Sequence, residues 1–96
     1  MGEMGRTPRI NAKGGRDHWT ECYSVMFAGA GIQGGTVYGA SDEQAAYIKD
    51  RPVHIREISA TIYHLLGIDP ETLVHDRADR PIPIAHGGAP VRGILA

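Results

Sequence analysis

The chain has 96 residues and a formal net charge of -1, and 42% of its residues are hydrophobic. This length suits one small domain with a modest core, and the hydrophobic content argues against disorder. Ten basic side chains face eleven acidic ones without a run of one sign, so neither the basic stripe of a nucleic-acid-binding protein nor the basic face of a membrane-surface helix is visible. No apolar stretch approaches the ~20 residues that cross a bilayer. We therefore expect neither nucleic acid nor a membrane as a partner.

Residues 1–22 are expected to form a loop, because glycine, proline and asparagine punctuate them and large apolar side chains are rare. The same segment is the richest in polar groups, among them Glu3, Arg6, Arg16, Asp17 and His18. Long loops in compact domains are uncommon and often functional. The sequence therefore predicts a polar site loop over 1–22.

Short strands are expected within residues 23–38. Tyr23 to Ala28 is a mostly apolar run that stops at glycines, which is typical of a buried strand. Thr36 to Tyr38 is β-branched and aromatic, which favours a short extended piece. Between them, Gly29 to Gly34 matches G-x-G-x-x-G, but a dinucleotide fingerprint needs a helix to follow directly. Residues 35–39 are poor helix sequence, so a glycine-rich turn is the preferred interpretation. Residues 40–53 are ambiguous: Asp42 to Ile48 could form a helical turn, but Asp50-Arg51-Pro52 then requires extended backbone.

The clearest helix is predicted over residues 54–66, where isoleucine and leucine side chains fall on one stripe at helical spacing. Glu57 suits the first turn, and Gly67 suits a left-handed residue after the last turn, with Ile68 folding back as in a Schellman motif. Asp69 is expected to cap a second short helix that begins at Pro70. Prolines and glycines then predict an irregular tail over 75–96, with both His75 and His86 in loops. Within this tail Ile82 and Ile84 alternate with prolines, which suits an edge strand.

Three features of the first loop suggest chemistry. Asp17 and His18 offer a carboxylate and an imidazole to a metal such as Zn²⁺, or Asp17 orients the imidazole from behind. Glu3 is a possible further carboxylate ligand, and the planar fork of Arg6 suits an anionic ester oxygen. The alternative for each is a solvated surface group. No Ser-His-Asp arrangement is identifiable, since no serine lies in a nucleophile elbow.

One strand, one good helix and much loop do not close a two-sided core. A buried strand needs neighbours on both sides, and this sequence supplies few. We therefore expect a missing N-terminal part of the same domain to be the main partner of these residues.

Several longer motifs follow one another along the chain. They are Glu3-x-Gly-Arg-Thr-Pro, Gly15-Arg16-Asp17-His18-Trp19, Phe27-Ala28-Gly29-x-Gly31-Ile32-x-Gly34-Gly35, Gly39-Ala40-Ser41-Asp42, Asp50-Arg51-Pro52-Val53 and Ala60-Thr61-Ile62-x-His64-Leu65-Leu66-Gly67-Ile68-Asp69. In this order they resemble a bacterial sulfatase-like family called domain of unknown function 1501. The likeness covers nearly the whole chain and implies the C-terminal part of an alkaline phosphatase-like α/β/α sandwich, within the α/β class. Enzymes of that superfamily hydrolyse phosphate or sulfate esters, often with two divalent metals.

The resemblance also implies roles for individual residues. Glu3, Asp17 and His18 are the expected ligands of a divalent metal such as zinc, calcium or manganese. Arg6 and Arg16 would stabilise charge on the transferring group of a small phosphate or sulfate ester. The nucleophile would lie in the absent part, so these 96 residues are expected to be inactive alone. Members are often exported with a twin-arginine signal, which suggests a periplasmic or exported protein. The alternative is a degenerate, non-catalytic secreted protein of the same fold that binds a ligand such as a glycan or has a structural role.

Overall fold

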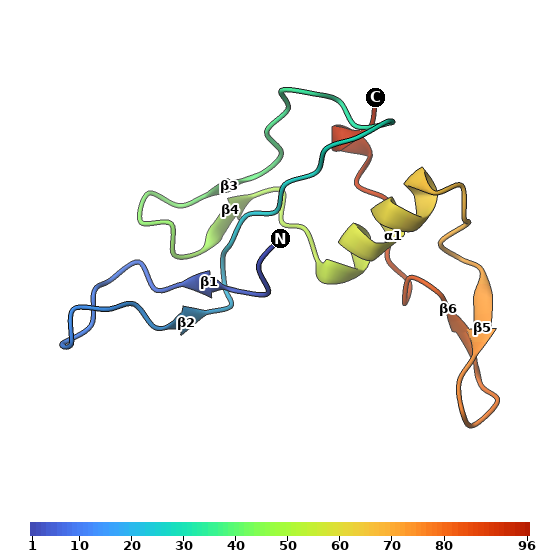
Figure 1. The fold of residues 1–96 in the computed structure, drawn as a ribbon, viewed down its shortest axis with the longest axis horizontal. Helices are drawn as coiled ribbons and strands as arrows, with labels where there is room; N and C mark the ends of the chain where they lie inside the picture. Colours follow the sequence, from blue (N-terminus) through green and yellow to red (C-terminus); the bar gives the residue numbers. More distant parts are fainter. The chain divides into compact units, whose positions relative to one another are not determined.

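The computed structural model describes residues 1–96 and contains three two-stranded antiparallel sheets, one α-helix and one short 3-10 helix joined by loops (Figure 1). This confirms the expected mixed α/β class, with short strands, one main helix and much loop. The chain separates into two compact units, one made of residues 1–28 and 37–52, the other of residues 29–36 and 53–96. None of its helices has the length and apolar character needed to traverse a bilayer.

The first unit begins with a hairpin where an uninterrupted loop was expected. Strand β1 (Gly5–Arg6) pairs with β2 (His18–Trp19), with Gly5 opposite Trp19 and Arg6 opposite His18. The intervening loop is closed by Asn11, whose side-chain oxygen accepts from the backbone N–H groups of Lys13 and Gly15 at 3.0 and 2.9 Å. Asparagine favours such turns because its short side chain replaces a backbone acceptor. The prediction for 1–22 was wrong in this respect.

A second hairpin of the first unit joins β3 (Ala40–Ser41) to β4 (Ile48–Asp50). The sequence allowed a helical turn over 42–48, but the structure has a tight non-helical turn organised by Asp42. Its Oδ1 accepts from the N–H of Ala46 at 2.8 Å, and its Oδ2 accepts from that of Tyr47 at 3.3 Å. A carboxylate with two backbone donors outcompetes the helical pattern at this point.

The strands expected within 23–38 do not form. Residues 22–28 run without a ladder partner, and Ile32 makes only an isolated bridge with Leu95. A strand needs a second backbone to receive its N–H and C=O groups, and no other segment of the chain offers one to 22–28. Met26, at 85% exposure, accordingly lies in the open. The buried strand predicted over Tyr23–Ala28 is therefore wrong for this structure.

The second unit contains helix α1 (Ile55–Leu65), which confirms the helix predicted over 54–66. His54 is its N-cap: Nδ1 accepts from the N–H of Arg56 at 3.2 Å, and the Glu57 carboxylate accepts from the His54 N–H at 2.7 Å. At the other end Gly67 has φ 76°, and the N–H of Ile68 reaches the carbonyl of Tyr63 at 2.9 Å. This is the Schellman arrangement that the sequence predicted.

The tail contains the edge strand predicted around Ile82, and it also contains a partner strand that was not expected. Strand β5 (Leu73–His75) pairs with β6 (Pro81–Pro83), so His75 lies on a strand and not in a loop. Pro81 and Pro83 cannot donate, and the ladder continues instead through the Ile84 N–H, which donates to the Thr72 carbonyl at 2.8 Å.

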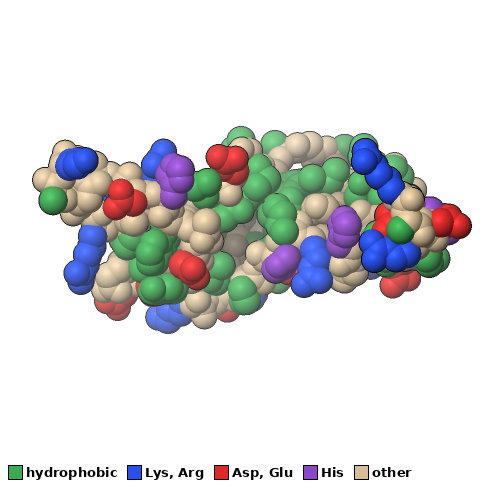
Figure 2. Space-filling model, turned by 90° about the horizontal axis from the view of Figure 1, so that it is seen from below, with side chains coloured by type: hydrophobic (Ala, Val, Ile, Leu, Met, Phe, Trp, Pro, Cys, Tyr) green, Lys and Arg blue, Asp and Glu red, His purple; other side chains and the backbone are tan.

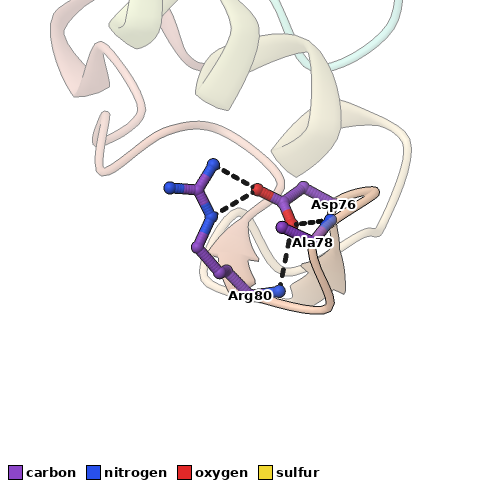
Figure 3. Close-up of polar contacts among 3 residues, drawn as sticks. All are labelled: Asp76, Ala78 and Arg80. Carbon is purple, nitrogen blue, oxygen red and sulfur yellow. Dashed lines mark hydrogen bonds and ion pairs between the residues drawn. The ribbon is translucent and has the colours of Figure 1, made fainter.

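The connection between β5 and β6 is closed by Asp76 (Figure 3). Its carboxylate accepts from the backbone N–H groups of Ala78 and Arg80 at 2.8 and 3.0 Å and pairs with the Arg80 guanidinium at 2.6 Å. This local network is the physical reason that residues 75–96 begin with a hairpin. Asp69, by contrast, caps a single turn and no second α-helix: Oδ1 accepts from the Glu71 N–H at 2.9 Å. A 3-10 helix η1 (Arg92–Ile94) precedes the last residues.

The buried core is small. The fully or nearly buried residues are Ala60, Thr61, Ala85 and Val91. Thr61 joins α1 to the segment before η1, because its Oγ1 accepts from the Val91 N–H at 2.9 Å. The opposite stripe of α1 remains open, with Ile55, Ile62 and Leu66 at 48%, 45% and 68% exposure. An apolar stripe at helical spacing normally packs against another element, but no element of this structure buries the stripe of α1.

Candidate functional site

The β1–β2 hairpin places a cation and an imidazole on one face. Arg6 and His18 are direct partners in the antiparallel register, and directly opposed residues carry their Cβ atoms on the same face, about 4.5–5.5 Å apart. Both side chains are exposed. Twelve positions separate them in sequence, and only the hairpin register brings them together.

The guanidinium groups of the hairpin also hold its loop. Arg16 Nη1 donates to the carbonyls of Thr7 and Pro8 at 2.8 and 2.9 Å. Arg6 Nη1 donates to the Arg16 carbonyl at 3.4 Å. These bonds fix the two arginines near one another and leave further N–H groups of each planar fork for an anion. The charge-stabilising roles of Arg6 and Arg16 stay a prediction.

Asp17 is tied into the same loop. Its Oδ1 accepts from Asn11 Nδ2 at 3.2 Å, and its backbone N–H donates to Thr7 Oγ1 at 3.1 Å. Asp17 immediately precedes His18, the first residue of β2, and successive side chains along extended backbone point to opposite faces. Asp17 therefore helps to shape the loop and does not simply extend the face of Arg6 and His18.

The three expected metal ligands are not gathered into one cluster by these residues. No group of three or more His, Cys, Asp or Glu side chains is positioned to hold a metal ion. Glu3 lies exposed ahead of β1. The residues of this chain therefore do not make a complete metal site by themselves, and the ligand roles of Glu3, Asp17 and His18 stay a prediction.

An apolar depression of about 600 Å³ lies on the first unit, and the sequence did not reveal it. Trp19 and Tyr47 meet edge to face there, with ring centroids 5.6 Å apart and planes at 66°. Trp19 Nε1 donates to the Ala46 carbonyl at 2.6 Å, which fixes the indole. The other lining residues are Thr7, Pro8, Arg9, Asp42 and Gln44. Trp19 was noted in the sequence, but its partner Tyr47 was not, because the turn that presents Tyr47 was not foreseen.

The formal charges of the chain nearly balance, with ten basic and eleven acidic side chains. On the face drawn in Figure 2, acidic and basic side chains are interspersed, with hydrophobic side chains reaching the surface between them. The pKa of Asp76 is lowered below its usual 3.8, mainly because its carboxylate accepts from the backbone N–H of Arg80 and secondly because it pairs with the Arg80 guanidinium. Asp76 belongs to the β5–β6 connection, so this shift reports on a structural turn and not on the polar hairpin.

The geometry so far defines a small α/β polypeptide with a polar hairpin, an aromatic depression and little core. The chain matches the family described as "Protein of unknown function (DUF1501)" over residues 1–95, and it belongs to that family. No curated protein and no solved structure shows significant similarity to it. The family expected from the motifs is therefore confirmed.

Proposed function

We propose that this chain is part of a hydrolase-like domain of the sulfatase and alkaline phosphatase type that acts on phosphate or sulfate esters. The likeness of its ordered motifs to that type supports the proposal. The observation that carries it is the pairing of Arg6 with His18 across the β1–β2 hairpin. A guanidinium fork matches the oxygens of an anionic ester, and an imidazole can accept or donate a proton at neutral pH.

A divalent metal such as zinc, calcium or manganese belongs to the proposal only with ligands from further polypeptide. Glu3, Asp17 and His18 are the residues of this chain that we propose for it. Because they are not gathered into a cluster, we assign this chain the binding and orientation of the ester and no step on the metal. Arg6 and Arg16 would hold the anionic group through charge-assisted hydrogen bonds.

The exposed apolar stripe of α1 supports the view that these residues pack against an N-terminal part of the same domain. Ile55, Ile62 and Leu66 share that stripe and are about half exposed, so covering their remaining surface would add roughly 0.7–2 kcal/mol for each side chain. On this proposal the 96 residues alone hydrolyse neither ester. Turnover of an aryl phosphate or aryl sulfate by the isolated chain would contradict it.

The experiment uses the complete gene product and measures hydrolysis of an aryl phosphate and an aryl sulfate, together with bound divalent metal. We expect Arg6→Ala to lower kcat by about 10²- to 10³-fold, and His18→Ala to release the metal. Arg77→Ala is the matched control, since this exposed arginine lies in the β5–β6 connection. Arg6→Lys tests whether the planar fork, and not the charge alone, is needed.

A second candidate is a non-catalytic protein of the same fold that binds a ligand. The aromatic depression favours it, because that feature offers binding groups without a nucleophile. A well-folded gene product that turns over neither ester and holds no metal would refute the hydrolase proposal and leave this one. On the likeness to the family we also propose export from the cytoplasm, which fractionation of producing cells would test.

A further inference from the structure

We propose that the aromatic depression, lined by Trp19, Tyr47, Arg9 and Gln44 among others, binds a saccharide that carries an acidic substituent. The inference goes beyond ester hydrolysis, since a catalytic and a non-catalytic protein could both use such a subsite. It rests on an arrangement within the first unit alone.

The floor of the depression suits the C–H face of a sugar ring. Aromatic rings carry negative charge on their faces, which attracts weakly positive C–H groups. Tyr47 is 53% exposed and so presents its ring to solvent. Trp19 is partly buried, and its bond to the Ala46 carbonyl holds the indole in place. A ligand would therefore meet rings that lose little conformational freedom on binding.

The rim of the depression selects for an acidic group. Arg9 and Gln44 are exposed lining residues, and their side chains can donate to hydroxyl or anionic oxygens. The Asp42 carboxylate, in contrast, is already engaged by the backbone N–H groups of Ala46 and Tyr47. The cationic fork of Arg9 thus remains available for a sulfate, phosphate or carboxylate.

The same rim argues against the other common ligand of aromatic pairs. Quaternary ammonium groups bind over tryptophan and tyrosine rings, and the depression is lined by one cation, Arg9, and one anion, Asp42. The Asp42 carboxylate is held by two backbone N–H groups, whereas the Arg9 guanidinium is exposed and disfavours a cationic ligand. The volume of about 600 Å³ lies within the range of small-molecule sites, roughly 300–1,000 Å³. An acidic sugar unit, with an apolar face and a charged edge, matches both the floor and the rim.

The experiment is titration calorimetry of the complete gene product with a sulfated galactan hexasaccharide and with the same hexasaccharide after chemical desulfation. We expect the sulfated form to bind and the desulfated form to bind more weakly. Tyr47→Ala should weaken binding by about 2- to 12-fold, the value of one aromatic contact, whereas Tyr47→Phe should retain it. Arg9→Gln should reduce the difference between the two ligands.

Matched controls separate this site from general effects. Tyr23→Ala removes a partly exposed tyrosine of the same unit, and Arg77→Gln removes an exposed arginine of the second unit. Both variants should bind as the unchanged protein does. Thermal unfolding of each variant shows that it is folded. The proposal is overturned if the folded protein does not bind the sulfated ligand, if Tyr47→Ala binds as tightly as the unchanged protein, or if desulfation has no effect. Because binding is measured without turnover, loss of the hydrolase proposal leaves this result intact.

Discussion

The substitution Thr61→Val tests the small core most directly. Thr61 is fully buried, and its Oγ1 makes two bonds: it donates to the Glu57 carbonyl at 2.6 Å and accepts from the Val91 N–H at 2.9 Å. Valine has nearly the same shape, so the packing of the site is kept while both bonds are lost. The Glu57 carbonyl retains its place in the helix, but the buried Val91 N–H loses its acceptor.

The loss of stability in Thr61→Val comes from the buried Val91 N–H that no longer has an acceptor. A buried polar group left without a partner costs about 1–3 kcal/mol, which corresponds to a roughly 5- to 150-fold change in an equilibrium constant. Thr61→Ser is the matched variant, because it keeps the hydroxyl and removes one methyl group, worth about 0.8 kcal/mol. Thr61→Val should therefore destabilise the protein more than Thr61→Ser does, although it removes no volume.

Two measurements check this order. Urea unfolding of the complete gene product gives the loss of stability, and amide hydrogen exchange gives the protection of the Val91 N–H. We expect the lower midpoint and the faster exchange for Thr61→Val. Equal stability of the two variants, with the Val91 amide still protected in Thr61→Val, would show that the hydroxyl does not anchor this segment to α1.

Two further predictions concern a close approach and a titrating turn. A Cβ at Gly88 would meet the Arg56 carbonyl oxygen, whereas a Cβ at Gly34 would meet nothing within 4 Å. Gly88→Ala should therefore lower the free energy of unfolding by about 1–3 kcal/mol, and Gly34→Ala should lower it far less. Thermal unfolding of the two variants measures the difference. The bonds to Arg80 lower the pKa of Asp76. The stabilisation that ionised Asp76 gives to the folded protein is therefore present above pH 3.8 and is lost as the pH falls through the lowered pKa. Protection of the amides in the β5–β6 connection, measured relative to their intrinsic exchange rates at each pH, should fall over that acidic range, and Asp76→Asn should remove this fall.

The helix could be predicted because its signals are local. The cap at His54, the reciprocal bond of Glu57 and the left-handed Gly67 all lie within a few residues of the helix that they limit. The strand expected at Tyr23–Ala28 did not form, because a ladder is not a local property of one segment. Its pattern states which face is apolar, but the ladder depends on another backbone that these residues do not contain.

The sequence identified residues of the candidate site on the β1–β2 hairpin, but it did not predict how they are arranged in space. Arg6 and His18 were singled out as residue types, but their face-to-face register depends on how Asn11 closes the loop between them. The position of Tyr47 was not predicted, because the sequence around Asp42 was compatible with a helical turn. In the structure the Asp42 carboxylate instead accepts hydrogen bonds from the backbone N–H groups of Ala46 and Tyr47. Side-chain bonds to the backbone within loops decided both outcomes, and sequence periodicity carries no information about them.

The prolines of β6 determine where its sheet can grow. The ladder uses the N–H groups on the side of Ile84, so Pro81 and Pro83 fall on the outer edge, which therefore lacks donors at both positions. A neighbouring strand that approached this edge would meet only carbonyl acceptors at these two positions and could not form a regular hydrogen-bonded ladder with it. Such an edge protects against sheet-to-sheet aggregation, and any strand that joins this hairpin in an assembled protein must arrive along β5.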